Sequence, residues 1–162
     1  MSECQETDFL KLDTQGAELL VLAGAQATLQ NALVVQTEVE FVPLYKRQPL
    51  FADIDSYLRA RGFAFHRLSF VQGRTFKPMV HNNDIHASMS QMLWGDAIYI
   101  RDFMRFDELT SAQLLKLAAI LNANYQSIDL AALALKSYDR IERTDVFYKY
   151  LEAVATKSPP NA

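Results

Sequence analysis

Two apolar runs with a helical pattern between them open the sequence. "DFLKLD" (8–13) is the first run, and "LVVQTEVEF" (33–41) is the second. Between them, "AELLVLAGA" has the spacing of a helix that ends near Gly24. Continuous apolar runs are typical of strands that are buried on both faces, as in parallel sheets. The pattern therefore predicts a right-handed βαβ unit with two parallel strands.

A helix and two more strands follow in the predicted sheet. Residues 51–62 form an amphipathic pattern that ends at Gly62, and 63–71 alternate as a strand. The last strand is expected in "AIYIR" (97–101), after about 20 residues without periodicity. Because no crossover helix is evident before it, we expect it to pair with the third strand in antiparallel fashion. A loop this long is usually functional or mobile.

From Phe106 onward the pattern is helical throughout. Helices are predicted in 110–121, 127–141 and 144–157, and the closing "KSPPNA" is expected to be disordered. We predict an α/β fold whose partial sheet has about four strands, the first two parallel and the last antiparallel, with helices on its faces. The expected domains are an α/β portion over 1–106 and a helical appendage over 107–162.

Composition narrows the classes of partner. The formal net charge is −3 and the arginines are dispersed, so we expect neither nucleic acid nor an anionic membrane as a partner. The one cysteine, Cys4, has no partner for an intrachain disulfide. No apolar run is long enough to span a bilayer, and the first residues lack the pattern of a secretory signal. We therefore expect a cytoplasmic location.

Four segments of the sequence resemble a known family. "DFLKLDTQGAELLVLAGA", "VVQTEVEFVPLY", "LFADIDSYLRARGF" and "QMLWGDAIYIRD", within 8–102, are similar to the carboxy-terminal half of FkbM-family methyltransferases. The resemblance implies a Rossmann-like methyltransferase sheet and the use of S-adenosylmethionine. It further implies methyl transfer to an oxygen of a small-molecule or glycan acceptor, such as a sugar or a secondary metabolite.

The glycines depart from the pattern of that family. The family's sheet begins with three earlier strands, one followed by a glycine-rich turn for the cofactor. Here five glycines are scattered and form no such loop. We therefore expect a truncated portion of an enzyme that is inactive alone and does not bind the methyl donor.

The same departure leaves a second function open. Without its neighbour, the strand in 8–13 would be an apolar edge, so we expect a second copy in a homo-oligomer, a partner chain or the chain's own carboxy-terminal helices to cover it. The alternative to an enzyme is therefore a non-catalytic interaction or oligomerisation module that uses this edge and the helical tail.

Acidic residues at strand ends are the candidate catalytic groups. Asp13 ends the first strand, where open α/β sheets place ligands, and the resemblance also implies contact with the methyl donor. Capping of the following helix would explain it equally. Glu18 in the first helical turn is either a site residue or a complement to the helix dipole. Glu38 and Glu40 share one strand face and serve either as bases or as partners of a lysine.

The loop after the second strand carries Tyr45, Lys46 and Arg47, which are expected either to line an acceptor site, with Tyr45 and Lys46 as its contacts, or to be ordinary surface residues. His81 and His86, with Asp84 between them, have a spacing that suits no zinc motif, so no metal is expected. Trp94 is expected to pack at the entry to the last strand.

Overall fold

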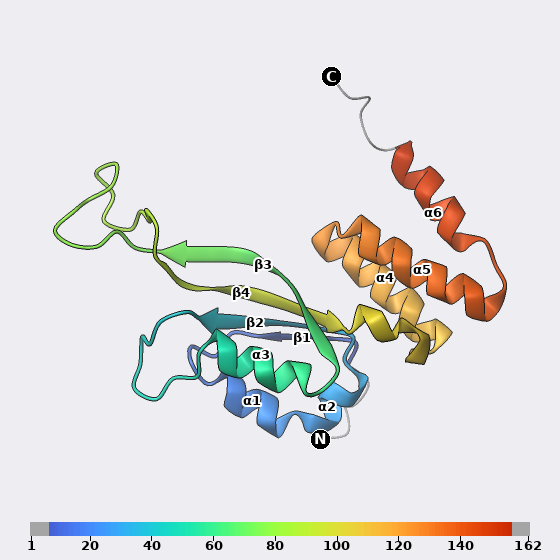
Figure 1. Ribbon diagram of the computed structural model, residues 1–162, viewed down its shortest axis with the longest axis horizontal. Coiled ribbons are helices and arrows are strands. Elements are labelled where there is room, and N and C mark those ends of the chain that lie inside the picture. Colours follow the sequence, from blue (N-terminus) through green and yellow to red (C-terminus); the bar gives the residue numbers. More distant parts are fainter. Residues whose placement is uncertain (1–6, 157–162) are drawn as a thin grey trace. The chain divides into compact units, whose positions relative to one another are not determined.

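The structure is a computed structural model that describes residues 7–156. Cys4 and the predicted disordered end, 157–162, lie outside the described residues. The chain divides into two compact units, Met1–Arg101 and Asp102–Ala162. Figure 1 labels the elements of both.

The first unit is a mixed α/β unit. Its elements are, in chain order, β1 (Phe9–Leu12), α1 (Glu18–Gly24), α2 (Gln26–Asn31), β2 (Val34–Glu40), α3 (Phe51–Arg59), β3 (Phe63–Gly73) and β4 (Met92–Arg101). The strands form one sheet in the order β1-β2-β4-β3. β1 and β2 are parallel, and β4 is antiparallel to both of its neighbours. This confirms the predicted fold class.

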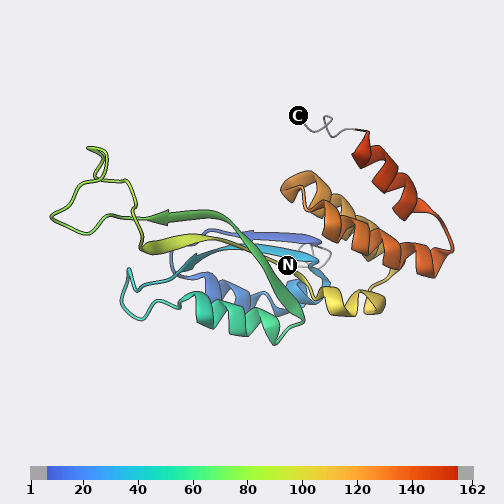
Figure 2. The same ribbon diagram turned by 45° about the horizontal axis from the view of Figure 1, so that its top comes forward.

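All three helices of this unit cover the same face of the sheet, as Figure 2 shows. The sequence pattern predicts helices on the faces of the sheet, whereas the structure places them on one face only. The steps from β1 to β2 and from β2 to β3 run in the same direction along the sheet, and right-handed crossovers in one direction place their helices on one face. The core between the helices and the sheet consists of Leu12, Leu22, Leu29, Ala32, Val35, Val39, Ile54, Leu58, Phe63, Ala97 and Tyr99.

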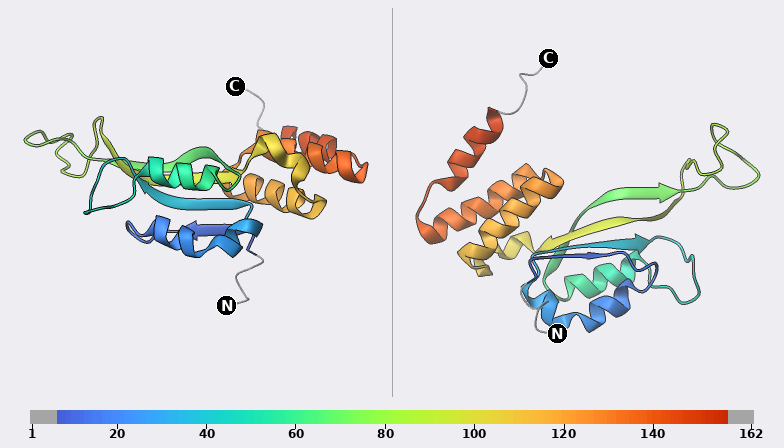
Figure 3. Two further views of the ribbon diagram at one scale, coloured as in Figure 1. Left: turned by 60° about the horizontal axis from the view of Figure 1, so that its bottom comes forward. Right: turned by 180° about the vertical axis from the view of Figure 1, so that it is seen from behind.

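Turns and bulges shape the ends of these elements. Gly62 follows α3 with φ +80°, the left-handed conformation that the sequence predicts there. β3 and β4 form a long hairpin whose connection, 74–91, extends away from the helices (Figure 3). Register shifts in the hairpin mark two irregularities in β3, at 65–67 and 68–70, and one in β4, between Met92 and Trp94.

The second unit is helical. It contains the 3₁₀ helix η1 (Phe103–Glu108), α4 (Ser111–Tyr125), α5 (Ile128–Glu142) and α6 (Val146–Ala155). Thr110 and Gln113 form the predicted capping box at the start of α4. Gln126, at φ 52°, ends α4 in the left-handed conformation and lets α5 return against it. The three α-helices were predicted from the sequence, and η1 was not.

Candidate functional site

The ends of β1 and β2 lie at the same edge of the sheet because the two strands are parallel. Glu38 and Glu40 lie on the face of β2 opposite to the core residues Val35 and Val39. The antiparallel register places Asp96 opposite Glu38 and Trp94 opposite Glu40. Carboxylates and an aromatic ring therefore gather at this edge, where open α/β sheets bind ligands.

A cavity of about 330 Å³ lies at this edge of the sheet. It is lined by Gln15, Glu38, Glu40, Leu44, Tyr45 and Trp94. Two aromatic rings and two carboxylates thus share one small cavity, whose size is in the range of small-molecule sites. The cavity brings together three of the predicted site residues, the two glutamates and Tyr45.

The electrostatics of the cavity favour proton exchange near neutral pH. The side chain of Glu40 is buried, at 3% exposure. This burial, followed by the negative charges of Glu18 and Glu38, raises the pKa of Glu40 to about 7. Burial also raises the pKa of Glu38, and the charges of Asp13, Glu18 and Asp96 add to the effect. A carboxyl group with a pKa near 7 is well suited to general acid–base work.

Glu18 organises the turn that leads into α1. Its side chain is buried, and its two carboxylate oxygens accept hydrogen bonds from the backbone N–H and hydroxyl of Thr14, at 2.8 and 3.0 Å, and from the backbone N–H of Gly16, at 2.9 Å. The Glu18 carboxylate is thus largely committed to holding the turn in place. The turn carries Gln15, which lines the cavity.

Asp13 lies at the rim of the acidic cluster. Its side chain is exposed, it does not line the cavity, and the N-cap of α1 is Ala17, so the capping explanation for Asp13 is wrong. Its charge does contribute to raising the pKa of Glu38. Contact between Asp13 and a methyl donor remains a prediction.

The loop between β2 and α3 forms one wall of the cavity. Tyr45 lines the cavity, whereas Lys46 is exposed and does not. In the described part of the chain, no lysine forms an ion pair with Glu38 or Glu40, so the pairing explanation for these glutamates is wrong.

Three residues of the site were not predicted from the sequence. Gln15 lines the cavity, and Gln48 accepts hydrogen bonds from the backbone N–H groups of the cavity residues Leu44 and Tyr45. Both glutamines come from turns without periodicity, and nothing in the sequence pattern singles them out. Trp94 lines the cavity, and the guanidinium of Arg74 lies 5.1 Å from its ring. Its strand position, across from Glu40, becomes visible only once the register is known.

The histidine-containing loop is ordered by hydrogen bonds along its own backbone. His81 and Asp84 form an isolated antiparallel bridge across a turn at Asn82 and Asn83, both with positive φ. Within residues 7–156, no group of three or more His, Cys, Asp or Glu side chains is arranged to hold a metal ion. No helix among these residues is long and apolar enough to cross a membrane.

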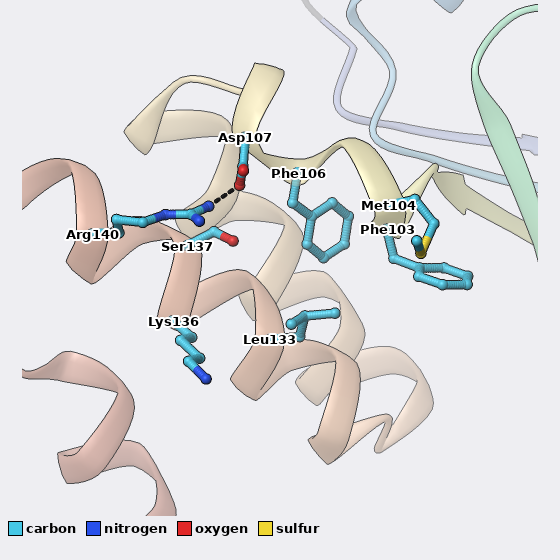
Figure 4. A pocket seen from close by; sticks show the side chains of 8 residues that line it. All are labelled: Phe103, Met104, Phe106, Asp107, Leu133, Lys136, Ser137 and Arg140. Carbon is cyan, nitrogen blue, oxygen red and sulfur yellow. Dashed lines mark hydrogen bonds and ion pairs between the residues drawn. The ribbon is translucent and has the colours of Figure 1, made fainter.

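A second cavity, of about 470 Å³, lies in the helical unit (Figure 4). It is lined by Phe103, Met104, Phe106, Asp107, Leu133, Lys136, Ser137 and Arg140. Its only carboxylate, Asp107, is paired with Arg140. This cavity therefore offers no free base, and the cavity at the sheet edge is the stronger candidate for a reactive site.

Comparison with known families finds a match in the first part of the chain. Residues 3–65 of the 162 match the family model described as the methyltransferase FkbM domain. The match confirms the resemblance over this segment, which includes Glu18, Glu38, Glu40 and Gln48, and it ends before the loop at 74–91 and before Trp94. No curated protein and no solved structure matches the chain.

Proposed function

We propose that the cavity at the sheet edge is the acceptor site of an S-adenosylmethionine-dependent O-methyltransferase, with a hydroxyl of a sugar or a secondary metabolite as the acceptor. The observation that carries this proposal is Glu40, a buried carboxyl group in a small cavity, with a pKa raised to about 7, inside the segment that matches the FkbM domain.

Each residue has a distinct role in this proposal. Glu40 accepts the proton of the acceptor hydroxyl, and burial, followed by the charges of Glu18 and Glu38, keeps the pKa of Glu40 high. Tyr45 and Trp94 form apolar walls that suit the ring of a sugar. Glu18 is a positioning residue, because it holds the turn that carries Gln15.

The described residues fit an acceptor better than they fit the methyl donor. S-adenosylmethionine would supply the methyl group, but the five glycines are dispersed and form no loop for close approach to a nucleotide. We therefore assign to this chain the binding of the acceptor and not the binding of the methyl donor. Calorimetry with S-adenosylmethionine and the full chain should show no binding at micromolar concentration, and micromolar affinity would contradict this assignment.

The acceptor site is tested by NMR with the ¹⁵N-labelled full chain and a panel of sugars and hydroxylated secondary metabolites. We expect ligands to shift the Trp94 indole and Gln15 side-chain signals. Affinity should rise with pH through the titration of Glu40, because the carboxylate accepts the hydroxyl hydrogen bond better than the acid does. Glu40→Gln should abolish this pH dependence, and Glu142→Gln, on an exposed position of α5, should preserve it. The proposal would be refuted if the ligands shifted neither signal, or if their affinity had the same pH dependence in the wild type and in Glu40→Gln.

A second candidate function rests on the position of β1. In the described sheet β1 is an edge strand, paired only with β2, and such edges invite association. We propose, as the alternative, an interaction module whose β1 edge pairs with a second copy or with a partner chain. Light scattering over a range of concentrations, with hydrogen exchange at Phe9–Leu12, tests this. A monomer whose β1 amides exchange rapidly would exclude it.

A further inference from the structure

The side chain of Gln48 connects three parts of the acceptor site. Gln48 lies in the loop between β2 and α3 and is half-buried. Its Oε1 accepts hydrogen bonds from the backbone N–H groups of Leu44, at 3.0 Å, and Tyr45, at 3.1 Å. Both of these residues line the cavity. One carbonyl oxygen thus fixes the backbone of the cavity wall.

The other end of the same amide faces the turn and the strand end. Nε2 is buried and, in the part of the chain that the structure describes, makes no hydrogen bond of normal geometry. If Gly16 carried a Cβ atom, that atom would lie 3.0 Å from Nε2 of Gln48. Nε2 is also close enough to Glu40 to stabilise the charged carboxylate, and so to lower a pKa that burial, Glu18 and Glu38 raise.

We propose that Gln48 is the positioning residue of this site, holding the wall at 44–45 and the turn at Gly16 around the carboxylate of Glu40. This inference rests on the proposed function for its purpose, but its geometry stands without it. The loop has no regular secondary structure between β2 and α3, so the two hydrogen bonds to Oε1 replace those that a strand or helix would supply.

Only an amide side chain at position 48 can both accept hydrogen bonds from the cavity wall and present an N–H donor to Glu40. A glutamate at position 48 would keep an oxygen acceptor for Leu44 and Tyr45 but would present a carboxylate, in place of an N–H donor, to Glu40. A methionine would have a similar length but would offer neither a good acceptor nor a donor. Gln48→Glu therefore keeps the acceptor for the cavity wall and replaces the Nε2 donor with a like charge, whereas Gln48→Met removes both the acceptor and the donor without adding a charge.

The titration of Glu40, followed by NMR of its side-chain carboxyl carbon, tests the proposal without any need for activity. The charged groups that face Glu40 are Glu18 and Glu38, and both remain in every variant. We expect the pKa of Glu40 to rise by about one unit in Gln48→Glu and by about half a unit in Gln48→Met. The amides of Leu44 and Tyr45 should exchange faster in Gln48→Met only. Gln26→Met, at an exposed position of α2, is the matched control.

The outcomes separate the two proposals. An unchanged Glu40 titration in folded Gln48→Glu would overturn the role of Gln48, whatever ligands the cavity binds. If Gln48→Met does not fold, Gln48→Glu still decides, because it keeps the hydrogen bonds to the wall. A shifted titration in a chain that binds no hydroxylated ligand would retain Gln48 as the positioning residue and reject the acceptor site.

Discussion

The carboxylate of Glu18 accepts a hydrogen bond from the backbone N–H of Gly16, two residues earlier in the chain, at 2.9 Å. Gly16 has φ +101° and its predecessor Gln15 has φ 52°, so two successive residues of the turn lie in the left-handed region. A backbone of this kind persists only where its surroundings hold it. The buried Glu18 side chain supplies that support at the mouth of the cavity.

Glu18→Gln should therefore destabilise the chain. A glutamine replaces one acceptor oxygen with an NH₂ group, which would face a backbone N–H with no acceptor between them. We expect a loss of about 1–3 kcal/mol in the free energy of unfolding, measured by chemical denaturation. The exposed Glu142→Gln in α5 should change stability by less than about 0.5 kcal/mol. Equal effects of the two substitutions would show that the turn does not depend on Glu18.

Glu40 should make stability fall as pH rises. Its pKa in the folded chain is about 7, above the ordinary value of 4.5, so between these pH values the folded state holds a proton that the unfolded state has lost. The free energy of unfolding then decreases with rising pH across this window. Relative to the wild type, Glu40→Gln should gain on the order of 2 kcal/mol by pH 8. Denaturation curves recorded from about pH 4.5 to 8 check this, and parallel pH profiles for the two proteins would contradict it.

Gly16 and Gly24 should respond in opposite ways to alanine. At Gly16, alanine meets an unfavourable φ of +101° and the Gln48 amide at 3.0 Å. At Gly24, the last residue of α1, nothing lies within 4 Å and alanine is the better helix former. We expect Gly16→Ala to cost about 1–2 kcal/mol and Gly24→Ala to be neutral or to stabilise by up to about 1 kcal/mol. Thermal unfolding of the two variants gives the comparison, and a tolerated Gly16→Ala would argue against the tight packing of Gln48.

The sheet could be predicted because its strands have strong, simple patterns. The apolar runs at Phe9–Leu12 and Val34–Glu40 indicate parallel strands, and the lack of a helix before the last strand indicates the antiparallel hairpin. The sequence predicts β3 to within two residues, as 63–71, but it predicts only the second half of β4, as 97–101. Bulges between Phe65 and Arg67 and between Leu68 and Phe70 break the alternation of β3, so its two faces could not be assigned from periodicity.

The site was predictable only where residues follow strand geometry. Glu38 and Glu40 are two residues apart on one strand and so share a face, which the sequence alone establishes. The contribution of Gln48 could not be foreseen, because it depends on how an irregular loop folds back on a turn some thirty residues earlier. The place of Trp94 in the cavity depends on strand register, which a single sequence does not specify.

In the helical unit, the side chain of Asp139 organises the start of α6. Asp139 on α5 accepts hydrogen bonds from the backbone N–H groups of Val146, at 2.9 Å, and Phe147, at 2.8 Å, and from the hydroxyl of Thr144. Partial burial raises the pKa of Asp139, but these hydrogen bonds and the charge of Lys149 outweigh it, and the net pKa is lowered. The carboxylate thus caps α6 from the neighbouring helix.

Asp139→Ala should detach α6 more than it unfolds the rest of the unit. No residue of α6 is buried, so the helix has little packing to replace the cap. We expect a loss of about 1–2 kcal/mol in the free energy of unfolding and faster amide exchange across Val146–Ala155, with little change in α4.

The stabilisation of α6 by Asp139 should also depend on pH. Because the pKa of Asp139 is lowered in the folded chain, this stabilisation is complete above the pKa of an unfolded aspartate and is lost as pH falls through the pKa of the folded state. Protection factors, which correct for the intrinsic pH dependence of exchange, should therefore decrease in α6 of the wild type as pH falls below the ordinary range of an aspartate, and should change much less in Asp139→Ala. Glu152→Gln, an exposed substitution within α6, should leave the pattern intact, and protection of α6 that survives Asp139→Ala would show that other contacts hold the helix.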